Sequence, residues 1–232
     1  MSETSNPAAH RPIRTFGRIG GRALSARQQG LIDTLLPHLS IPHGETASID
    51  PLSLFENAKE IWLEIGFGGA EHFLEQARRN PDTGLIGCEP FIEGMAKALT
   101  GIEDSGLTNT RLWMDDAREM MARLTPHSLS RVFILFPDPW PKKRQQKRRL
   151  IQDDFIEELI RLIKPGGQVR FATDVMSYAD EALEKFTKNP SIEWTASSAD
   201  NWRNPPLDHV TTRYETKQLG DCAPVWFDFR VK

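Results

Sequence analysis

Short apolar runs alternate with segments of helical spacing over most of the chain, starting near residue 60. The apolar runs lie at 61–66, 85–89, 111–114, 131–136 and 168–173. The segments that follow them carry apolar residues three or four positions apart, at 70–79, 91–104, 117–124, 150–163 and 175–186. This alternation predicts an α/β fold in which strand–helix units build a parallel sheet with helices on both faces. The segment LIKPGG, residues 162–167, is typical of a helix end before the next strand.

Both ends of the chain depart from this alternation. Residues 31–57 mix short apolar runs with prolines and predict lead-in structure before the sheet. The last two apolar runs, 192–194 and 225–231, resemble strands, and no helical segment follows the second. We expect these two runs to form an antiparallel pair that closes one edge of the sheet.

The first 30 residues carry a distinct charge pattern. From Thr4 to Ile32 there is no acidic residue, but five arginines are interspersed with glycines. This pattern predicts a flexible basic arm over residues 1–30, followed by a single domain over 31–232. A disordered terminus without function would have the same composition.

Composition excludes several classes of protein. Apolar residues make up 39% of the chain, and no uncharged run approaches the roughly 18 residues that a membrane span needs. The first residues show no apolar segment behind a basic one, so no secretory signal is expected, and two cysteines indicate no disulfide framework. A reducing cytoplasm is therefore the expected location. Because the formal net charge is -3, any site for a polyanion must be a local patch.

The residues after each apolar run carry the candidate chemistry, since ligands of such sheets bind beyond the carboxyl ends of the strands. Glycines at 66 and 68 follow the first run and would let backbone approach a ligand closely. A dinucleotide-binding loop would have a third glycine at position 71, where Glu71 stands. Glu64 and Glu71 disfavour a pyrophosphate here and favour a ligand with a cationic centre.

Acidic residues follow the next two runs. Glu89 lies about 20 residues beyond the glycine turn, where an acid binds the hydroxyls of an adenosine ribose. Asp115 and Asp116 follow the third run, where a polar side chain would meet an adenine amino group. Each signal is weak alone, but together they indicate a nucleoside cofactor without a diphosphate. S-adenosylmethionine fits that description.

The fourth run ends in Phe-Pro-Asp-Pro-Trp, residues 136–140, and continues into a block of cations. The two prolines stiffen the backbone and present Asp138 on a rigid loop. Trp140 could stack on a base or cap the core. A basic block is commonly a solvated face. Beside a cofactor pocket in an acidic protein, however, this one indicates a surface that binds phosphates.

The motifs LEIGFGG, GCEP, FPDPWPKKRQQKRR, ATD and TRYE, in this order and spacing, resemble the bacterial tRNA (guanine-N7)-methyltransferase family. The resemblance extends from RTFGRIGGR near the start to VWFDFRV at the end. It implies the Rossmann-like class I methyltransferase fold, with a seven-stranded, mostly parallel sheet and one antiparallel strand. It also implies methyl transfer from S-adenosyl-L-methionine to N7 of guanosine 46 in the variable loop of tRNA.

The resemblance also implies roles for individual residues. The cofactor-binding positions are Glu64, Gly66, Gly68, Glu89, Asp116 and Asp138, and Asp138 is also the catalytic residue. The substrate-binding positions are Lys142, Asp174, Thr212, Arg213, Tyr214 and Glu215. The RNA-contacting positions are Arg144, Gln145, Gln146, Lys147, Arg148 and Arg149. The sequence departs from the family at Pro141, where some members have histidine, in the GGAEH loop and after Gly220.

These residue types suit methylation of guanine N7. That nitrogen carries a lone pair and no proton, so the reaction depends on positioning more than on a strong base. A carboxylate can orient the guanine through its N1–H and exocyclic amine and offset the positive charge that develops on the ring. Asp138 is the first candidate, with Asp174 and Glu215 as helpers. The six histidines lack metal-ligand spacing, so we expect no metal.

Two other classes of protein remain as alternatives. A non-catalytic RNA-binding module on the same fold would keep the basic block but could lose the pocket acids, which are all present here. A nicotinamide-dependent oxidoreductase would have glycine where Glu71 stands.

Overall fold

The computed structural model describes residues 23–44 and 48–232. Its sheet contains β1 (Glu60–Ile65), β2 (Thr83–Cys88), β3 (Thr110–Trp113), β4 (Leu129–Leu135), β5 (Ile163–Thr173), β6 (Ile192–Trp194) and β7 (Val225–Val231). The strand order is β3-β2-β1-β4-β5-β7-β6. Strands β1 to β5 pair in parallel, and β7 runs antiparallel to both of its neighbours, β5 and β6. The predicted sheet, including the antiparallel pair at its edge, is confirmed.

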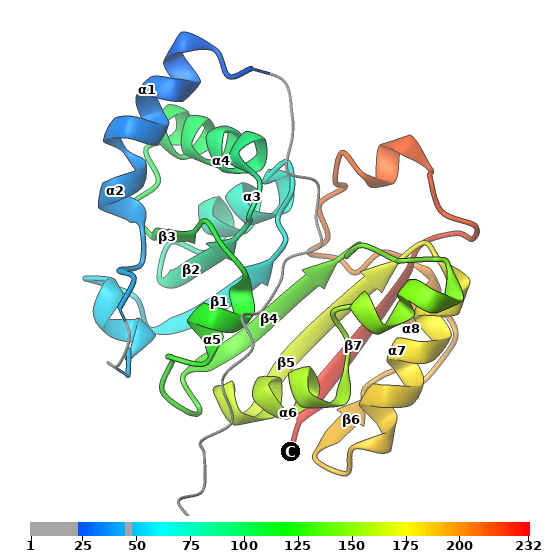
Figure 1. Ribbon diagram of the computed structural model, residues 1–232. Helices are drawn as coiled ribbons and strands as arrows, with labels where there is room; N and C mark the ends of the chain where they lie inside the picture. Colours follow the sequence, from blue (N-terminus) through cyan, green and yellow to red (C-terminus); the bar gives the residue numbers. More distant parts are fainter. Residues whose placement is uncertain (1–22, 45–47) are drawn as a thin grey trace, which may run out of the picture.

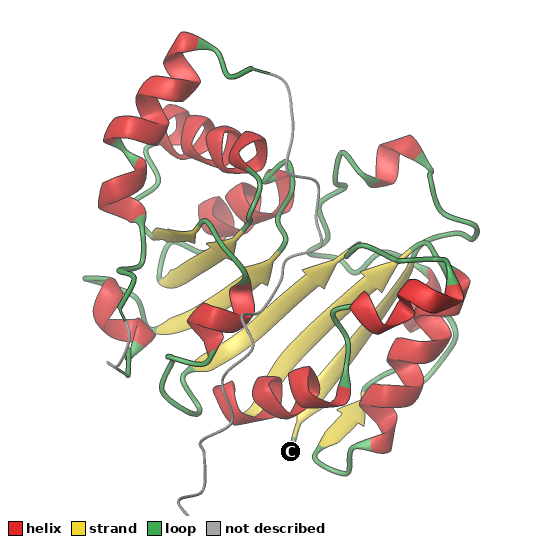
Figure 2. Ribbon diagram, in the orientation of Figure 1, coloured by secondary structure: helices red, strands yellow, loops and turns green. Residues whose placement is uncertain are grey.

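Helices cover both faces of the sheet (Figures 1 and 2). They are α3 (Glu71–Arg79), α4 (Ile92–Ser105), α5 (Ala117–Met121), α6 (Asp153–Leu162), α7 (Met176–Lys188) and the short α8 (Asp200–Arg203). Helices α5, α6 and α7 share one large apolar cluster with β1, β4, β5 and β7, whereas α3 and α4 pack in a second cluster on the other face. Short 3-10 helices occur at η1 (Pro51–Leu54), η2 (Lys143–Arg148) and η3 (Glu215–Lys217).

Within the described residues two α-helices precede the sheet, α1 (Ala26–Thr34) and α2 (Leu36–Leu39), where the sequence predicted the end of the arm and lead-in structure. Ser25 caps α1 through a reciprocal pair of hydrogen bonds with Gln28, and Arg27 pairs with acids at the end of α4. Residues 26–30 of the predicted arm therefore belong to α1, and the division of the chain at residue 30 stays a prediction. Residues 1–22 of that arm lie outside the described part of the chain.

The segment between β4 and β5 also differs from the prediction. Helix α6 begins at Asp153 rather than at Leu150 and ends at Leu162. Strand β5 starts at once at Ile163, which pairs with Leu129 of β4, so the LIKPGG segment expected to end a helix lies mostly in a strand. Among the described residues, no helix has the length and apolar character needed to cross a bilayer.

The sheet order reverses between β1 and β4, since β2 and β3 extend to one side and β5, β7 and β6 to the other. In open α/β sheets such a reversal leaves a crevice beyond the carboxyl ends of the two strands. The loops after β1 and β4 carry the glycine turn and the Pro-Asp-Pro segment. The topology therefore brings the two most distinctive sequence motifs to the same edge of the sheet.

Candidate active site

A pocket of about 320 Å³ lies at this reversal of the sheet. Its walls come from the loops after four strands: Gly66 and Gly68 after β1, Glu89 after β2, Asp115 and Asp116 after β3, and Asp138 after β4. Residues that were predicted separately at four strand ends are therefore close together. The remaining walls are mostly apolar and include Ile65, Phe91 and Leu150.

The glycine turn and Glu89 form one unit. Gly66 and Gly68 have φ angles of 75° and 54°, which lie in the left-handed region that glycine adopts without strain. The amide of Gly68 donates to Oε2 of Glu89 at 2.8 Å, and the amide of Phe91 donates to Oε1 at 3.0 Å. Burial raises the pKa of Glu89 despite these two hydrogen bonds. Each carboxylate oxygen keeps a further lone pair, so Glu89 can still accept from two hydroxyl groups in the pocket.

Asp116 lies at the N-terminus of α5. Its Oδ1 accepts from the backbone amide of Arg118 at 3.0 Å, and the Arg118 guanidinium binds both carboxylate oxygens at 2.9 and 2.6 Å. Asp116 is thereby buried and fixed in direction, while Arg118 joins the pocket wall. Sequence reasoning missed Arg118, although an arginine two residues after a capping acid is a signal that could have been used.

The backbone of the Pro-Asp-Pro loop is strained on both sides of Asp138. Phe136 and Trp140, which flank the loop, have φ angles of 51° and 41°, unfavourable for residues other than glycine. Asp138 is solvent-exposed between them, but the pocket walls remove part of its hydration and raise the pKa of its carboxyl group. The loop therefore presents a carboxylate whose proton affinity is increased by its surroundings.

Trp140 is half-buried and lines the pocket, so it does not belong to the core clusters. The guanidinium of Arg148 lies 5.0 Å from the centre of one of its rings, which is cation–π distance. Arg148 lines the same pocket. The tryptophan and the basic block thus meet at the pocket wall.

A second pocket of about 290 Å³ contains Asp174 and Glu215, two predicted substrate-binding residues, together with Gly220 and Cys222. Tyr214 hydrogen-bonds to Asp174, and its pKa is raised by burial and then by the charges of Asp174 and Asp138. The Tyr214 ring also lies 5.5 Å from that of Phe136. Tyr214 therefore stands between the Pro-Asp-Pro loop and the second pocket.

The other predicted substrate residues have different environments. The Thr212 amide donates to Oε1 of Glu215 at 2.7 Å, which fixes the turn before η3, and Arg213 is exposed beside it. Lys142 is exposed at the N-terminus of η2 and lines neither of the two pockets. These residues stay predictions as substrate contacts.

Glu64 does not line the cofactor pocket that was predicted for it. It is 4% exposed, and its Oε2 lies 2.7 Å from Nδ1 of His72. Strand alternation explains this placement, because its neighbours Leu63 and Ile65 pack in the large apolar cluster while Glu64 points to the opposite face. The carboxylate belongs to a polar network beneath α3.

Arg149 corrects the prediction that residues 144–149 all contact RNA. It is 2% exposed, and its guanidinium donates to the carbonyl of Pro139 at 2.8 Å, to both the carbonyl and hydroxyl of Ser177, and to Glu181. These bonds attach the Pro-Asp-Pro loop to α7, so the side chain is unavailable to a ligand. By contrast, Arg144 and Lys147 are exposed, Gln145, Gln146 and Arg148 are half-buried, and all five stay predictions as RNA contacts.

Comparison with known proteins agrees with this architecture. A family model described as "Putative methyltransferase" matches residues 58–227. The chain is 57% identical to the tRNA (guanine-N(7)-)-methyltransferase of Hyphomonas neptunium, over 95% of this chain and 100% of that protein. It is 50% identical to the enzyme of the same name from Caulobacter vibrioides, over 97% and 98% of the two chains.

Solved structures with low sequence identity share the fold. A precorrin-6y C5,15-methyltransferase from Geobacter metallireducens aligns with a TM-score of 0.52 at 16% identity, covering 79% of this chain and 86% of that one. An rRNA methylase from Streptococcus thermophilus aligns with a TM-score of 0.50 at 12% identity, covering 78% and 92%. At such identities the likeness concerns the fold alone. The sequence matches to the curated relatives go further, and by them this chain belongs to the tRNA (guanine-N(7)-)-methyltransferase family.

Proposed function

We propose that this protein transfers a methyl group from S-adenosylmethionine to N7 of a guanosine in tRNA, at position 46 of the variable loop, and does so in the cytoplasm. The observation that carries the proposal is the convergence of Gly68, Glu89, Asp116 and Asp138 on one pocket, with Tyr214 close both to Asp138 and to Asp174 of the second pocket. Family membership supports the same reaction.

The pocket residues fit an adenosyl ligand. Glu89 would bind the two ribose hydroxyls with the lone pairs that Gly68 and Phe91 leave available. Asp116, held by Arg118, would accept from the adenine amino group. The apolar walls suit a purine ring, and the surrounding carboxylates suit a sulfonium centre. When bound, S-adenosylmethionine supplies an electrophilic methyl group on its sulfur.

The second pocket would hold the guanine. Asp174 and Glu215 offer carboxylates for its N1–H and exocyclic amine, and Tyr214 offers an aromatic face between the two pockets. Asp138 would lie at the junction and stabilise the positive charge that develops on the imidazole ring as N7 is alkylated. No proton has to leave N7, so these residues act chiefly by orienting the base, an effect that can lower the barrier by about 7–11 kcal/mol.

The exposed cations of η2 would hold the tRNA backbone. Arg144 and Lys147 are solvent-exposed on a short helix that follows the Pro-Asp-Pro loop directly. A phosphate bound there would lie near the residues that we assign to the base. The η2 helix thus links the proposed backbone contact to the proposed reaction site.

The test is incubation of the protein with labelled S-adenosylmethionine and an unmodified tRNA transcript, followed by nucleoside analysis. We expect label in 7-methylguanosine with the natural transcript, and none with a matched transcript that carries adenosine at position 46. Label in 7-methylguanosine from both transcripts would refute the position but keep the reaction. If no 7-methylguanosine forms while the protein still binds tRNA, the non-catalytic RNA-binding alternative replaces the enzyme.

A further inference from the structure

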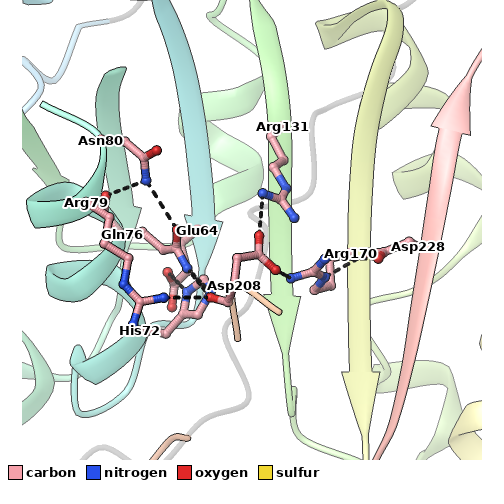
Figure 3. Close-up of polar contacts among 9 residues, drawn as sticks. All are labelled: Glu64, His72, Gln76, Arg79, Asn80, Arg131, Arg170, Asp208 and Asp228. Atoms are coloured by element: carbon pink, nitrogen blue, oxygen red, sulfur yellow. Dashed lines mark hydrogen bonds and ion pairs between the residues drawn. The ribbon is translucent and has the colours of Figure 1, made fainter. Parts of the chain in front are cut away.

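A cluster of charged residues lies on the face of the sheet opposite α6 and α7 (Figure 3). Arg131 of β4 and Arg170 of β5 both contact Asp208, which belongs to the long connection from β6 to β7. The distances from Asp208 are 2.7 Å to Arg131 and 2.6 Å to Arg170. Arg170 also binds Asp228 of β7 through two hydrogen bonds of 2.7 and 2.9 Å. One acidic side chain thus attaches a connection of some thirty residues to the centre of the sheet.

The two arginines of the cluster are largely removed from water, whereas the side chain of Asp208 is 36% exposed. Arg170 is 4% exposed, and the guanidinium of Arg131 lies 4.6 Å from the centre of the Phe133 ring. Burial alone would raise the pKa of Asp208, but Arg170 and Arg131 outweigh it and lower that pKa to about 2. Removing the carboxylate would leave Arg131 without its ion-pair partner in a site that water reaches poorly. The position of Asp208 is therefore strongly constrained.

The main chain of Asp208 makes a second attachment, to α3. Its carbonyl accepts from Nε2 of Gln76 at 2.7 Å, and the same amide nitrogen lies 3.3 Å from Nε2 of His72. The Gln76 amide has two hydrogens, so it can donate to both acceptors. His72 then carries its proton on Nδ1 and donates to Glu64 at 2.7 Å (Figure 3). The chain Glu64–His72–Gln76 thus connects the end of β1 and the helix after the glycine turn to Asp208.

The next residue makes a third attachment. Nε2 of His209 lies 2.8 Å from Oε2 of Glu215, whose other oxygen accepts from the amide of Thr212. Burial would raise the pKa of Glu215, but these hydrogen bonds from His209 and Thr212 hold it below its usual value. The ring of His209 also lies edge-on to Trp226 of β7, with the two ring centres 5.3 Å apart. Residues 208 and 209 therefore connect the sheet and α3 to the segment that we assign to guanine.

We propose that Asp208 is a positioning residue: it holds the Thr212–Glu215 segment in register with the glycine turn, so that guanine and cofactor meet at the correct distance. The proposal rests on the proposed function of the two pockets. Asp208 lines neither of them, so it acts through His209 on one side and Gln76 on the other. This role also explains why Glu64 points away from the cofactor pocket.

The test compares Asp208→Ala and Asp208→Asn with Asp200→Ala, which removes an exposed acid from the same connection between β6 and β7. Four quantities are measured on the full chain: the dissociation constant for S-adenosylmethionine, kcat, KM for tRNA, and amide hydrogen exchange over residues 210–220. For Asp208→Ala we expect kcat/KM for tRNA to fall on the order of 10- to 100-fold, because misplacement by about 1 Å has such effects. We expect exchange over 210–220 to accelerate, and cofactor affinity to stay within about threefold, since the pocket that binds it is intact.

Asp208→Asn keeps the volume and one acceptor oxygen, so it should fold even where Asp208→Ala does not, and should show a smaller change of the same kind. Asp200→Ala should match the wild type in all four quantities. Unchanged hydrogen exchange and unchanged KM in both Asp208 variants would overturn the proposal, as would an equal loss of cofactor and tRNA affinity, which indicates general support of the core. If the wild type made no 7-methylguanosine, the proposed function would fail by itself, and hydrogen exchange would still decide whether Asp208 orders the segment.

Discussion

The two sides of the proposed reaction site are held in place by different forces. On the cofactor side, the loops after β1, β2 and β3 are short, lead directly into helices and lie on apolar clusters. On the guanine side, residues 195–224 form a long connection with only two short helical turns, and the ion pairs of Asp208 with Arg131 and Arg170 attach it to the sheet. We refer to these as the cofactor side and the guanine side.

This difference has consequences for substrate specificity and for how far the sequence of each side can vary. A site built from strand ends is fixed by the fold, so related methyltransferases can keep it while their substrates differ. A long connection can change in sequence and length without disturbing the sheet, provided that its anchoring residues persist. In the function that we propose, the cofactor side therefore supplies the general chemistry and the guanine side determines the choice of substrate.

The largest expected effect comes from Asp138, where the two sides meet. Asp138→Ala should lower kcat about 10²- to 10³-fold, the range seen when a group that stabilises developing charge is removed. The melting temperature should stay close to that of the wild type, because the side chain is exposed. Single-turnover assays with saturating tRNA measure the first quantity and calorimetry the second. Turnover at the wild-type rate would remove Asp138 from the catalytic role.

A comparison of two arginines tests which residues of the basic block support the fold and which contact RNA. Arg149→Met should lower the free energy of unfolding by about 2–3 kcal/mol, because it removes the hydrogen bonds that a buried guanidinium makes to Pro139, Ser177 and Glu181. Arg144→Met should change stability by less than about 0.5 kcal/mol, since Arg144 is exposed. Urea unfolding measures both changes.

The same two variants should differ in the opposite direction in tRNA binding, where Arg144→Met should have the larger effect. Arg144→Met should reduce the slope of log affinity against log salt concentration by about one, the value for one lost phosphate contact. Filter binding at several salt concentrations provides this slope. An unchanged slope for Arg144→Met, and also for Lys147→Met, would indicate that η2 is only a solvated face.

Separate substitutions should weaken the two ligands independently. Glu89→Ala should reduce affinity for S-adenosylmethionine by about 1.5–3 kcal/mol, the contribution of hydrogen bonds to a charged group, while tRNA affinity persists. Glu215→Ala should leave cofactor affinity unchanged and raise KM for tRNA. Titration calorimetry measures the two affinities and steady-state kinetics measure KM, with Glu103→Ala, an exposed acid on α4, as the control. Equal loss of both ligands in either variant would contradict the division into two sides.

The smallest expected effect is a pH dependence of stability from Asp208. Its folded pKa of about 2 lies below the ordinary value of 3.8, so its ionised form stabilises the fold above the ordinary pKa and this contribution disappears as the pH falls toward 2. Because the side chain is 36% exposed, we expect no more than about 1 kcal/mol. Urea unfolding between pH 5 and pH 3 should show a steeper loss for the wild type than for Asp208→Asn. Parallel curves would show that the ion pair contributes no net stability.

The sequence predicted the cofactor side better than the guanine side, for a physical reason. Periodicity locates strands, and the side chains that follow parallel strands must meet at one edge of the sheet, so Glu89, Asp116 and Asp138 could be placed together. Residues 195–224 have no such period, and their position depends on pairs such as Asp208 with Arg170, which are 38 residues apart. Nothing local marks such a pair. The early helix α1 escaped prediction because it buries only Leu31 and so shows little apolar periodicity.

Two side chains point in directions that their sequence motifs did not indicate. Arg149 belongs to the basic block by sequence, but η2 ends at Arg148 and the following backbone turns the Arg149 side chain inward toward α7. Glu64 belongs to the glycine motif, but strand alternation turns it toward His72. In both cases the motif gave the location of the residue, and only the backbone determined which way it points.

The strained backbone on either side of Asp138 has a consequence for the selection of thermostable variants. Phe136 and Trp140 hold positive φ angles, and such conformations cost on the order of 1–3 kcal/mol each for residues other than glycine. A search for thermostable variants should therefore recover glycine at these positions, because glycine relieves the strain. Such variants would gain heat resistance and lose turnover, since a relaxed loop no longer fixes its carboxylate. In this short loop, lower thermal stability therefore accompanies faster turnover.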